Sequence, residues 1–327
     1  MHRVFLIILS LLALSQIVLQ GQQLERYESI NYKMGTTWKI IIYTTDQPTA
    51  EEAFEAGWTR VDELNQIFSD YEAMSEATSL SHTSGSDTWV EVSEDMWAVL
   101  SFSKNLSELT DGAFDVTIGP LSKLWRRAIR QQEYPKQEYL AKAQSSVGYK
   151  LFDYDTHQKR VKLLKSDMQL DFGGIAKGYT VDAVYQTLEQ LGIEHMLIDG
   201  GGDMRASKDK PDGDRWLVKL GAQQDSFFLS DQSIATSGDK FKHLNFEGKR
   251  YAHIINPQAS AGVENMKNVT ALAPDCMTAD ALASAISVVG QVKGEELIKH
   301  YTNSFFYITT SNGVLVLKNG RDMPEEN

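Results

Sequence analysis

Residues 171–182 (Asp-Phe-Gly-Gly-Ile-Ala-Lys-Gly-Tyr-Thr-Val-Asp) constrain this chain most, because they place glycines and a lysine between two regular elements. Apolar residues 168–170 are typical of a strand end, and residues 181–191 have helical periodicity. Glycine lets a backbone approach a ligand closely, and a helix N-terminus favours an anion such as phosphate. Lys177 adds a positive charge. A plain strand–turn–helix junction with a surface lysine would read the same way, because one glycine pair is a weak signal.

The composition is that of a globular protein with an acidic balance. The 327 residues are enough for one large or two ordinary domains, and the hydrophobic fraction is 42%. The net charge of −12 argues against a nucleic-acid partner, which would require a basic face. An anionic ligand would therefore need local compensation from a lysine, a helix dipole or a metal ion.

The first residues indicate the compartment. A short basic start, His2-Arg3, precedes the almost wholly apolar residues 4–19, which predicts a signal peptide over residues 1–21 and a mature domain over 22–327. The apolar run is shorter than the roughly 20 residues of a spanning helix. The alternative is an uncleaved leader that anchors the protein in the inner membrane. Cys276 is the only cysteine, so no disulfide forms within the chain, and we expect an exported, periplasmic protein.

Hydrophobic periodicity predicts an α+β fold of mixed sheets with flanking helices, because strands and helices alternate without a regular βαβ rhythm. A Ser/Thr-rich loop is expected to run from the end of the first helix to about residue 87. The expected helices are 49–68, 93–109 (capped by Ser93), 126–142, 181–191, 278–289 and 292–300. The expected strands are 38–43, 148–154, 160–165, 196–199, 216–220, 226–229, 233–237, 251–257, 269–273 and two near residues 305 and 314.

Two further groups carry possible chemistry. Asp280 and Ser284 are four residues apart, hence on one helix face, and their oxygens suit Mg²⁺ if a bound phosphate completes the coordination. Alternatively, Thr278 caps this helix, Asp280 is stabilised by the dipole and Ser284 packs. His253 lies within a predicted strand, where a histidine is either a hydrogen-bonded core or edge residue or a base tuned by neighbouring carboxylates.

Several short motifs follow one another along the chain. They are Met34-Gly35-Thr36-Thr37, Asp70-Tyr71, Gly112-Ala113-Phe114-Asp115, Gly119-Pro120-Leu121, residues 171–178, Gly201-Gly202-Asp203, His253-Ile254-Ile255-Asn256-Pro257 and Thr278-Ala279-Asp280. Their order resembles that of the ApbE family of flavin transferases over nearly the whole mature chain. The resemblance implies a two-lobed, T-fold-like architecture with an FAD cleft between the lobes.

The resemblance implies an activity. Such enzymes bind FAD with a divalent metal, usually Mg²⁺, and transfer the FMN moiety to a Thr or Ser of an acceptor protein with release of AMP. The implied acceptor is a subunit of a membrane electron-transfer complex. Two alternatives use the same site: Mg²⁺-dependent hydrolysis of FAD to FMN and AMP, and FAD binding without turnover.

The resemblance also assigns roles to residues of this chain. His253 would lie near the scissile diphosphate and act as the base for the acceptor hydroxyl. The metal would be held by the backbone carbonyl of Gly174 and by Asp280 and Ser284. The FAD site would be lined by Met34, Tyr71, Ala113, Phe114, Asp115, Asp171, Lys177 and the backbone near Ile254.

Three positions depart from the family pattern. Ser284 stands where Thr is usual, and it keeps the hydroxyl that a metal would need. Asn256 replaces an Asp, which removes a carboxylate near His253. Ala259-Ser260 replaces a usual Thr-Gly pair, which weakens the expectation of a tight turn there.

Overall fold

In the computed structural model, residues 23–220, 225–238, 243–264 and 268–309 are described, and their largest sheet has seven antiparallel strands. The antiparallel pairing explains why the sequence shows no βαβ rhythm. In sheet order the strands are β1 (Glu25–Lys33), β2 (Thr36–Thr44), β6 (His195–Gly200), β7 (Met204–Ala206), β10 (Gln232–Ser237), β14 (Asn268–Ala273) and β15 (Phe305–Thr309).

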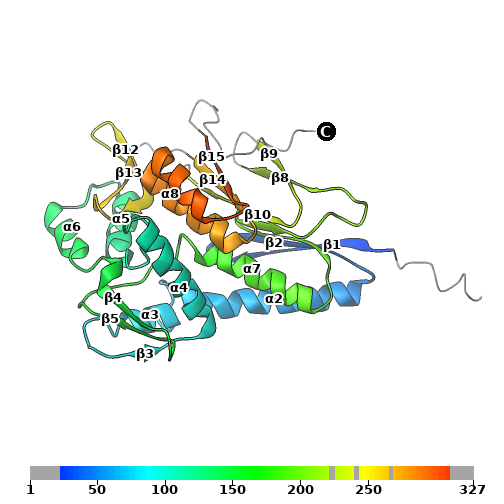
Figure 1. Cartoon of the computed structure of the whole chain (residues 1–327), viewed down its shortest axis with the longest axis horizontal. Helices are drawn as coiled ribbons and strands as arrows, with labels where there is room; N and C mark the ends of the chain where they lie inside the picture. Colours follow the sequence, from blue (N-terminus) through cyan, green and yellow to red (C-terminus); the bar gives the residue numbers. More distant parts are fainter. Residues whose placement is uncertain (1–22, 221–224, 239–242, 265–267, 310–327) are drawn as a thin grey trace, which may run out of the picture.

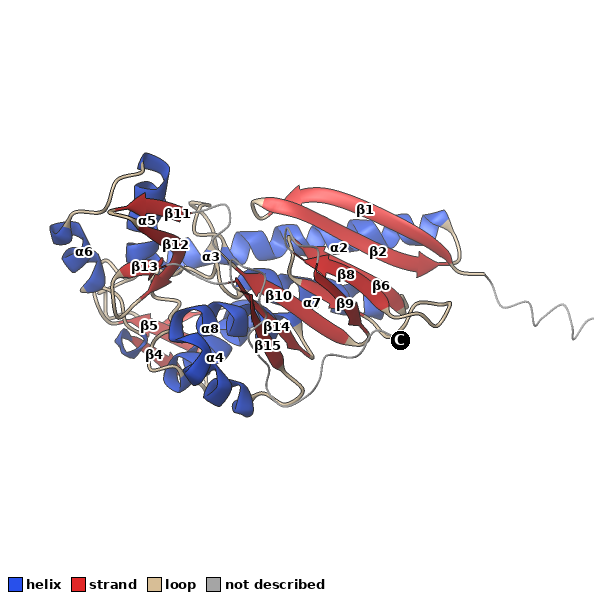
Figure 2. Cartoon of the chain, turned by 90° about the horizontal axis from the view of Figure 1, so that it is seen from above, coloured by secondary structure: helices blue, strands red, loops and turns tan. Residues whose placement is uncertain are grey.

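The two faces of this sheet are covered by different elements (Figures 1 and 2). Strand alternation turns Ile40 and Ile42 of β2 toward α2 (Gln47–Phe68) and α7 (Ala176–Gln190), with which they form one core. Ile41 points to the opposite face and joins Trp216 of the hairpin β8 (Trp216–Leu220) and β9 (Asp225–Leu229). This arrangement fixes α7, and the glycine turn before it, against the sheet.

Most of the remaining described elements lie past the C-terminal end of α2 (Figure 1). Helix α8 (Cys276–Leu297) connects them to the large sheet, because Leu282 and Ile286 share one core with Met96 and Leu100. The elements are α3 (Glu76–Ser81), β3 (Val90–Glu91), α4 (Glu94–Leu109), α5 (Gly119–Gln131), α6 (Gln137–Gln144), η1 (Tyr149–Leu151), β4 (Phe152–Asp155), β5 (Arg160–Leu163), β11 (His243–Phe246), β12 (Lys249–Asn256), β13 (Ala261–Glu264) and η2 (Ile298–His300).

Several sequence-based boundaries were wrong. The helix predicted over 126–142 is two helices, α5 and α6, and Gln132 ends α5 in a left-handed conformation with φ 54°. The expected Ser/Thr-rich loop contains α3. Strand β1 was missed, and the strand expected near residue 314 lies outside the described residues. The helix cap is Asp275 rather than Thr278, since the Asp275 side chain accepts from the Thr278 N–H.

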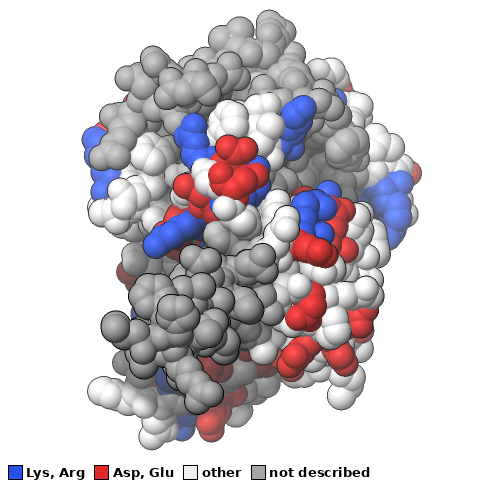
Figure 3. Space-filling view, turned by 90° about the vertical axis from the view of Figure 1, so that its right-hand side faces the viewer, with Lys and Arg blue, Asp and Glu red and all other residues white. Residues whose placement is uncertain are grey.

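The fold class predicted from the sequence is confirmed: an α+β protein with mixed helices and sheets. Within the described residues, no helix is long and apolar enough to span a membrane, and the predicted leader lies outside them. The single mature domain stays a prediction. On the face drawn in Figure 3, basic side chains lie among acidic ones rather than in one continuous patch.

Helices α7 and α8 meet at their N-terminal ends. A Cβ on Gly178 would lie 2.3 Å from the Cys276 carbonyl oxygen, so only glycine permits this approach. Buried Asp182 of α7 accepts hydrogen bonds from the backbone N–H groups of Cys276 (2.9 Å) and Met277 (2.8 Å). Its Oδ1 also pairs with Arg205 at 2.7 Å. One carboxylate therefore ties α7 to the start of α8 and to β7.

We expect Asp182→Asn to lower the free energy of unfolding by about 3 kcal/mol, because it leaves the Arg205 guanidinium without its carboxylate in a mostly buried setting. Urea denaturation followed by circular dichroism measures this change. Glu189→Gln, on the exposed face of the same helix, is the matched control and should change stability by less than about 0.5 kcal/mol. Equal losses in the two variants would contradict the proposed role of Asp182.

Candidate functional site

The glycine turn before α7 packs directly on α8. Gly174 lies against Ser284, since a Cβ added to Gly174 would be 2.9 Å from the Ser284 Oγ. The backbone N–H of Gly178 donates to the Asp280 carboxylate at 3.1 Å. Asp280 and Ser284 thus occupy the face of α8 that meets the turn. Two segments about a hundred residues apart in the sequence are therefore in direct contact.

The start of α7 offers fewer donors than the sequence suggested. The Ala176 N–H donates to the Phe172 carbonyl at 2.9 Å, and the Gly178 N–H is used by Asp280. Gly178 serves the contact between helices rather than a close approach to a ligand. Positive charge for an anion at this end must therefore come mainly from the helix dipole and from Lys177.

Lys177 lies between two buried carboxylates. Its Nζ forms an ion pair with Asp203 and lies 3.6 Å from the Asp280 Oδ2. Burial alone would lower the pKa of Lys177, but the charges of Asp203 and Asp280 reverse this effect and raise it. Burial raises the pKa of Asp203 to about 7, with Asp280 adding to the rise and Lys177 opposing it. Lys177 is thus a fixed cation at the junction, and its side chain remains 29% exposed.

The oxygen atoms on this face suit a hard cation. Asp280 supplies a carboxylate, Ser284 a hydroxyl, and the Gly174 backbone lies next to that hydroxyl. Ser237 of β10 is 3.1 Å from Ser284, measured between the hydroxyl oxygens. Among the described residues, no cluster of three or more His, Cys, Asp or Glu side chains could hold a metal. A cation here would need oxygens from a bound phosphate, which is how Mg²⁺ is commonly held.

The run Ala113-Phe114-Asp115 lies beside the turn, but its side chains are used by the fold. Phe114 is 7% exposed and belongs to the large core, with its ring near Gly174. Asp115 accepts from the Thr117 N–H at 2.8 Å and from the Thr117 hydroxyl at 2.7 Å. Burial raises the pKa of Asp115, which these hydrogen bonds oppose. A contact of this run with FAD would therefore be made by backbone atoms rather than by the Phe114 ring.

Tyr71 and Asp171 both contact the side chain of Arg126. Tyr71 is 77% exposed, and its ring stacks on the Arg126 guanidinium at 4.7 Å. The same guanidinium pairs with Asp171 at 2.7 Å and with Asp70. Burial raises the pKa of Asp70, and Asp171 adds to this rise while Arg126 opposes it.

Met34 forms the turn between β1 and β2 with φ 48° and packs against two cores.

His253 and Ile254 lie on β12, which contacts α8 and α5. His253 is exposed and Ile254 is half-buried. The pairing of β12 with β13 shifts register between Tyr251 and Ile255, and such irregularities redirect side chains. The Asn256 departure has a local explanation, because its side-chain oxygen accepts from the Gln258 N–H at 2.9 Å. This amide closes the turn after β12 as a carboxylate would.

Sequence reasoning missed three residues of this region. Asp203 belongs to the motif Gly201-Gly202-Asp203, but nothing in the sequence indicated its ion pair with Lys177. Asp182 ended the opening motif without an assigned role. Arg126 had no sequence signal, since its partners are 56 and 45 residues away.

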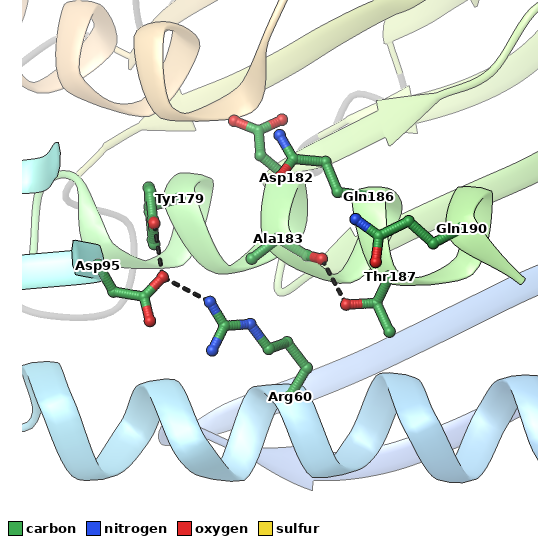
Figure 4. A pocket seen from close by; sticks show the side chains of 8 residues that line it. All are labelled: Arg60, Asp95, Tyr179, Asp182, Ala183, Gln186, Thr187 and Gln190. Atoms are coloured by element: carbon green, nitrogen blue, oxygen red, sulfur yellow. Dashed lines mark hydrogen bonds and ion pairs between the residues drawn. The ribbon is translucent and has the colours of Figure 1, made fainter. Parts of the chain in front are cut away.

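A separate pocket of about 280 Å³ lies between α2, α4 and α7 (Figure 4). In it, Asp95 binds both Arg60 and the Tyr179 hydroxyl, the latter at 2.7 Å. None of the residues assigned to FAD or to the metal lines this pocket. The expected cleft for FAD between the two lobes stays a prediction.

Comparison with known proteins places this arrangement in a family. Residues 34–307 match the ApbE family. An FAD:protein FMN transferase of Haemophilus influenzae is 31% identical over 297 residues, which cover 86% of each chain. One from Escherichia coli K12 is 29% identical over 288 residues, covering 84% of this chain and 82% of that protein.

Solved structures agree with the sequence matches. The apo form of the Pseudomonas stutzeri flavinyl transferase ApbE superposes with a TM-score of 0.77 at 26% identity, covering 91% of this chain and 95% of that one. The flavin transferase ApbE of Vibrio cholerae gives a TM-score of 0.77 at 27% identity, covering 91% and 97%. The chain described here therefore belongs to the ApbE family.

Proposed function

We propose that this protein is an FAD:protein FMN transferase that moves the FMN moiety of FAD to a Ser or Thr hydroxyl of an acceptor protein and releases AMP. The observation that carries the proposal is the convergence of the Gly174 turn, Lys177, Asp280 and Ser284 at one junction. The similarity of nearly the whole chain to flavin transferases supports the same reaction.

The residues at the junction have different roles in this reaction. Gly174, Asp280 and Ser284 would hold Mg²⁺, which, when bound, supplies positive charge to the diphosphate oxygens. Lys177 contributes a second positive charge, and the ion pair with Asp203 keeps its ammonium group in place. The dipole of α7 adds partial positive charge at the same end. These groups stabilise the charge that builds up as the diphosphate is cleaved.

The transfer requires a base. The hydroxyl oxygen of the acceptor forms a bond to the phosphorus of the FMN moiety, and the bond from that phosphorus to the bridging oxygen breaks. The bridging oxygen leaves with AMP. The hydroxyl proton passes to His253, whose exposed position on β12 allows a macromolecular acceptor to approach.

The cellular setting is part of the proposal. The apolar residues 4–19 support export to the periplasm, with the leader either cleaved or kept as an inner-membrane anchor. The proposed acceptor is a subunit of a membrane electron-transfer complex that carries a Ser or Thr flavinylation site. Co-expression with such a subunit, followed by mass spectrometry, should show an added FMN on the acceptor.

Incubation with FAD, Mg²⁺ and an acceptor tests the reaction directly. We expect a fluorescent acceptor band that survives denaturing electrophoresis, together with released AMP. Free FMN and AMP without labelling would identify a hydrolase instead. Intact FAD recovered from the protein would identify a binding protein and contradict the proposal.

We expect Asp280→Ala to abolish AMP release, because it removes the carboxylate proposed to hold Mg²⁺. Ser284→Thr keeps a hydroxyl and should retain activity, whereas Ser284→Ala should raise the Mg²⁺ concentration needed for half-maximal rate. AMP release is measured by chromatography across a Mg²⁺ titration. Unchanged AMP release in Asp280→Ala would refute the assignment of this residue.

We expect His253→Ala to lower the labelling rate of the acceptor at least about 100-fold, the size usual for loss of a general base, with FAD affinity unchanged. Labelling is followed by in-gel flavin fluorescence and FAD binding by fluorescence quenching. His157→Ala, an exposed histidine on the turn between β4 and β5, is the control and should label normally. A normal rate in His253→Ala would remove this residue from the mechanism.

A further inference from the structure

Arg126 connects three segments that are distant in the sequence. It lies on α5, and its guanidinium pairs with Asp70 after α2 and with Asp171 before α7. The Asp171 side chain also accepts from the Gly173 N–H at 2.8 Å. Arg126 is therefore tied, through one carboxylate, to the start of the glycine turn that packs against Ser284.

The two carboxylates need this cation. The Asp70 and Asp171 side chains are only 13% and 9% exposed, and they converge on one guanidinium. Two carboxylates at one site oppose each other's ionisation unless a positive charge lies between them. Arg is suited to this task because its planar fork can donate to two acceptors at once, which a lysine ammonium does less well.

Arg126 also supports the Tyr71 ring. The backbone of the loop around Tyr71 is held by its own side chains, since the Ser69 hydroxyl accepts from the N–H groups of Tyr71 and Glu72, both at 3.3 Å. The ring itself is largely exposed and stacks on the guanidinium at 4.7 Å. A ring supported on one side and exposed over most of its surface is suited to receive a flat heteroaromatic ligand.

We propose that Arg126 is a positioning residue that sets the Tyr71 ring and the Asp171 carboxylate in the arrangement that receives the flat ring system of FAD. The inference rests on the proposed function, and it extends that function to a residue on α5 which no motif indicated. Arg126 acts through its two neighbours and takes no part in the bond changes.

Arg126→Gln is the test, because it keeps a polar side chain and removes the charge and the guanidinium group. We expect the Kd for FAD, measured by flavin fluorescence quenching, to rise about tenfold. The KM for FAD in AMP release should rise equally, while kcat at saturating FAD stays within about twofold. Arg126→Lys should give an intermediate Kd, because an ammonium keeps the charge but not the planar fork.

Two further variants separate positioning from general stability. Arg127→Gln is the matched control, since Arg127 is exposed and its Nε donates only along its own helix, to Gln131 at 2.9 Å. The double variant Asp70→Asn/Arg126→Gln removes one of the facing carboxylates. It should recover the thermal midpoint lost in Arg126→Gln without recovering FAD affinity, because Tyr71 still lacks its guanidinium support.

The outcomes distinguish the two proposals. A parental Kd in Arg126→Gln, or in the double variant if the single variant does not fold, would overturn the positioning role and leave the transferase proposal intact. Recovery of both stability and affinity in the double variant would also overturn it, because stability alone would then explain the loss. A parent protein that does not bind FAD would overturn the transferase proposal, and the inference with it.

Discussion

The site depends on the close approach of α7 and α8 at their N-terminal ends. Gly178 removes the Cβ that would collide with the Cys276 carbonyl, and Asp182 then binds the first N–H groups of α8. Helix ends carry unsatisfied donors, and a buried end needs partners for them. Asp182 of α7 is the partner for these N–H groups. The same contact therefore satisfies the N-terminal end of α8 and fixes the position of α8 along α7. This contact therefore also fixes the positions of Asp280 and Ser284, which lie further along α8.

Charge compensation in this acidic protein is local. The chain has a net charge of −12, yet the junction gathers a lysine and a helix dipole where we propose that a diphosphate binds. Lys177 is itself held by the buried carboxylates of Asp203 and Asp280. Burial lowers the pKa of the Lys177 ammonium group, and the charges of the two carboxylates outweigh this effect and raise it.

Much of the fold could be predicted from the sequence, and the failures have physical causes. Strand β2 and helices α2 and α4 pack one apolar side on a core, so their periodicity is visible. Strand β1 is an edge strand whose residues are mostly exposed, which leaves no apolar alternation to detect. Helix α5 begins at Gly119-Pro120. Pro is favoured at the first position of a helix, but it is also common in turns, so this pair does not reveal the helix start.

The site could be predicted only where its residues lie in local motifs. The turn, Lys177, Asp280 and Ser284 come from two short segments, so a resemblance could propose them, and the structure brings those segments into contact. The Arg126 ion pairs join residues that no local pattern relates. Long-range pairs of this kind follow from tertiary packing. The contact between Gly178 and α8 also depends on tertiary packing, so only a structure could show it.

The residues assigned to FAD also differ in how far they are buried. Phe114 and Asp115 belong to the interior, where one packs in the core and the other closes a turn. Their motif therefore shapes the backbone beside the glycine turn. Tyr71 has the opposite character: most of it is exposed, and a guanidinium supports its ring. If the flavin ring needs an aromatic partner from these residues, Tyr71 is the one with surface to offer, so ring recognition would depend on an exposed loop anchored from α5 rather than on the rigid core.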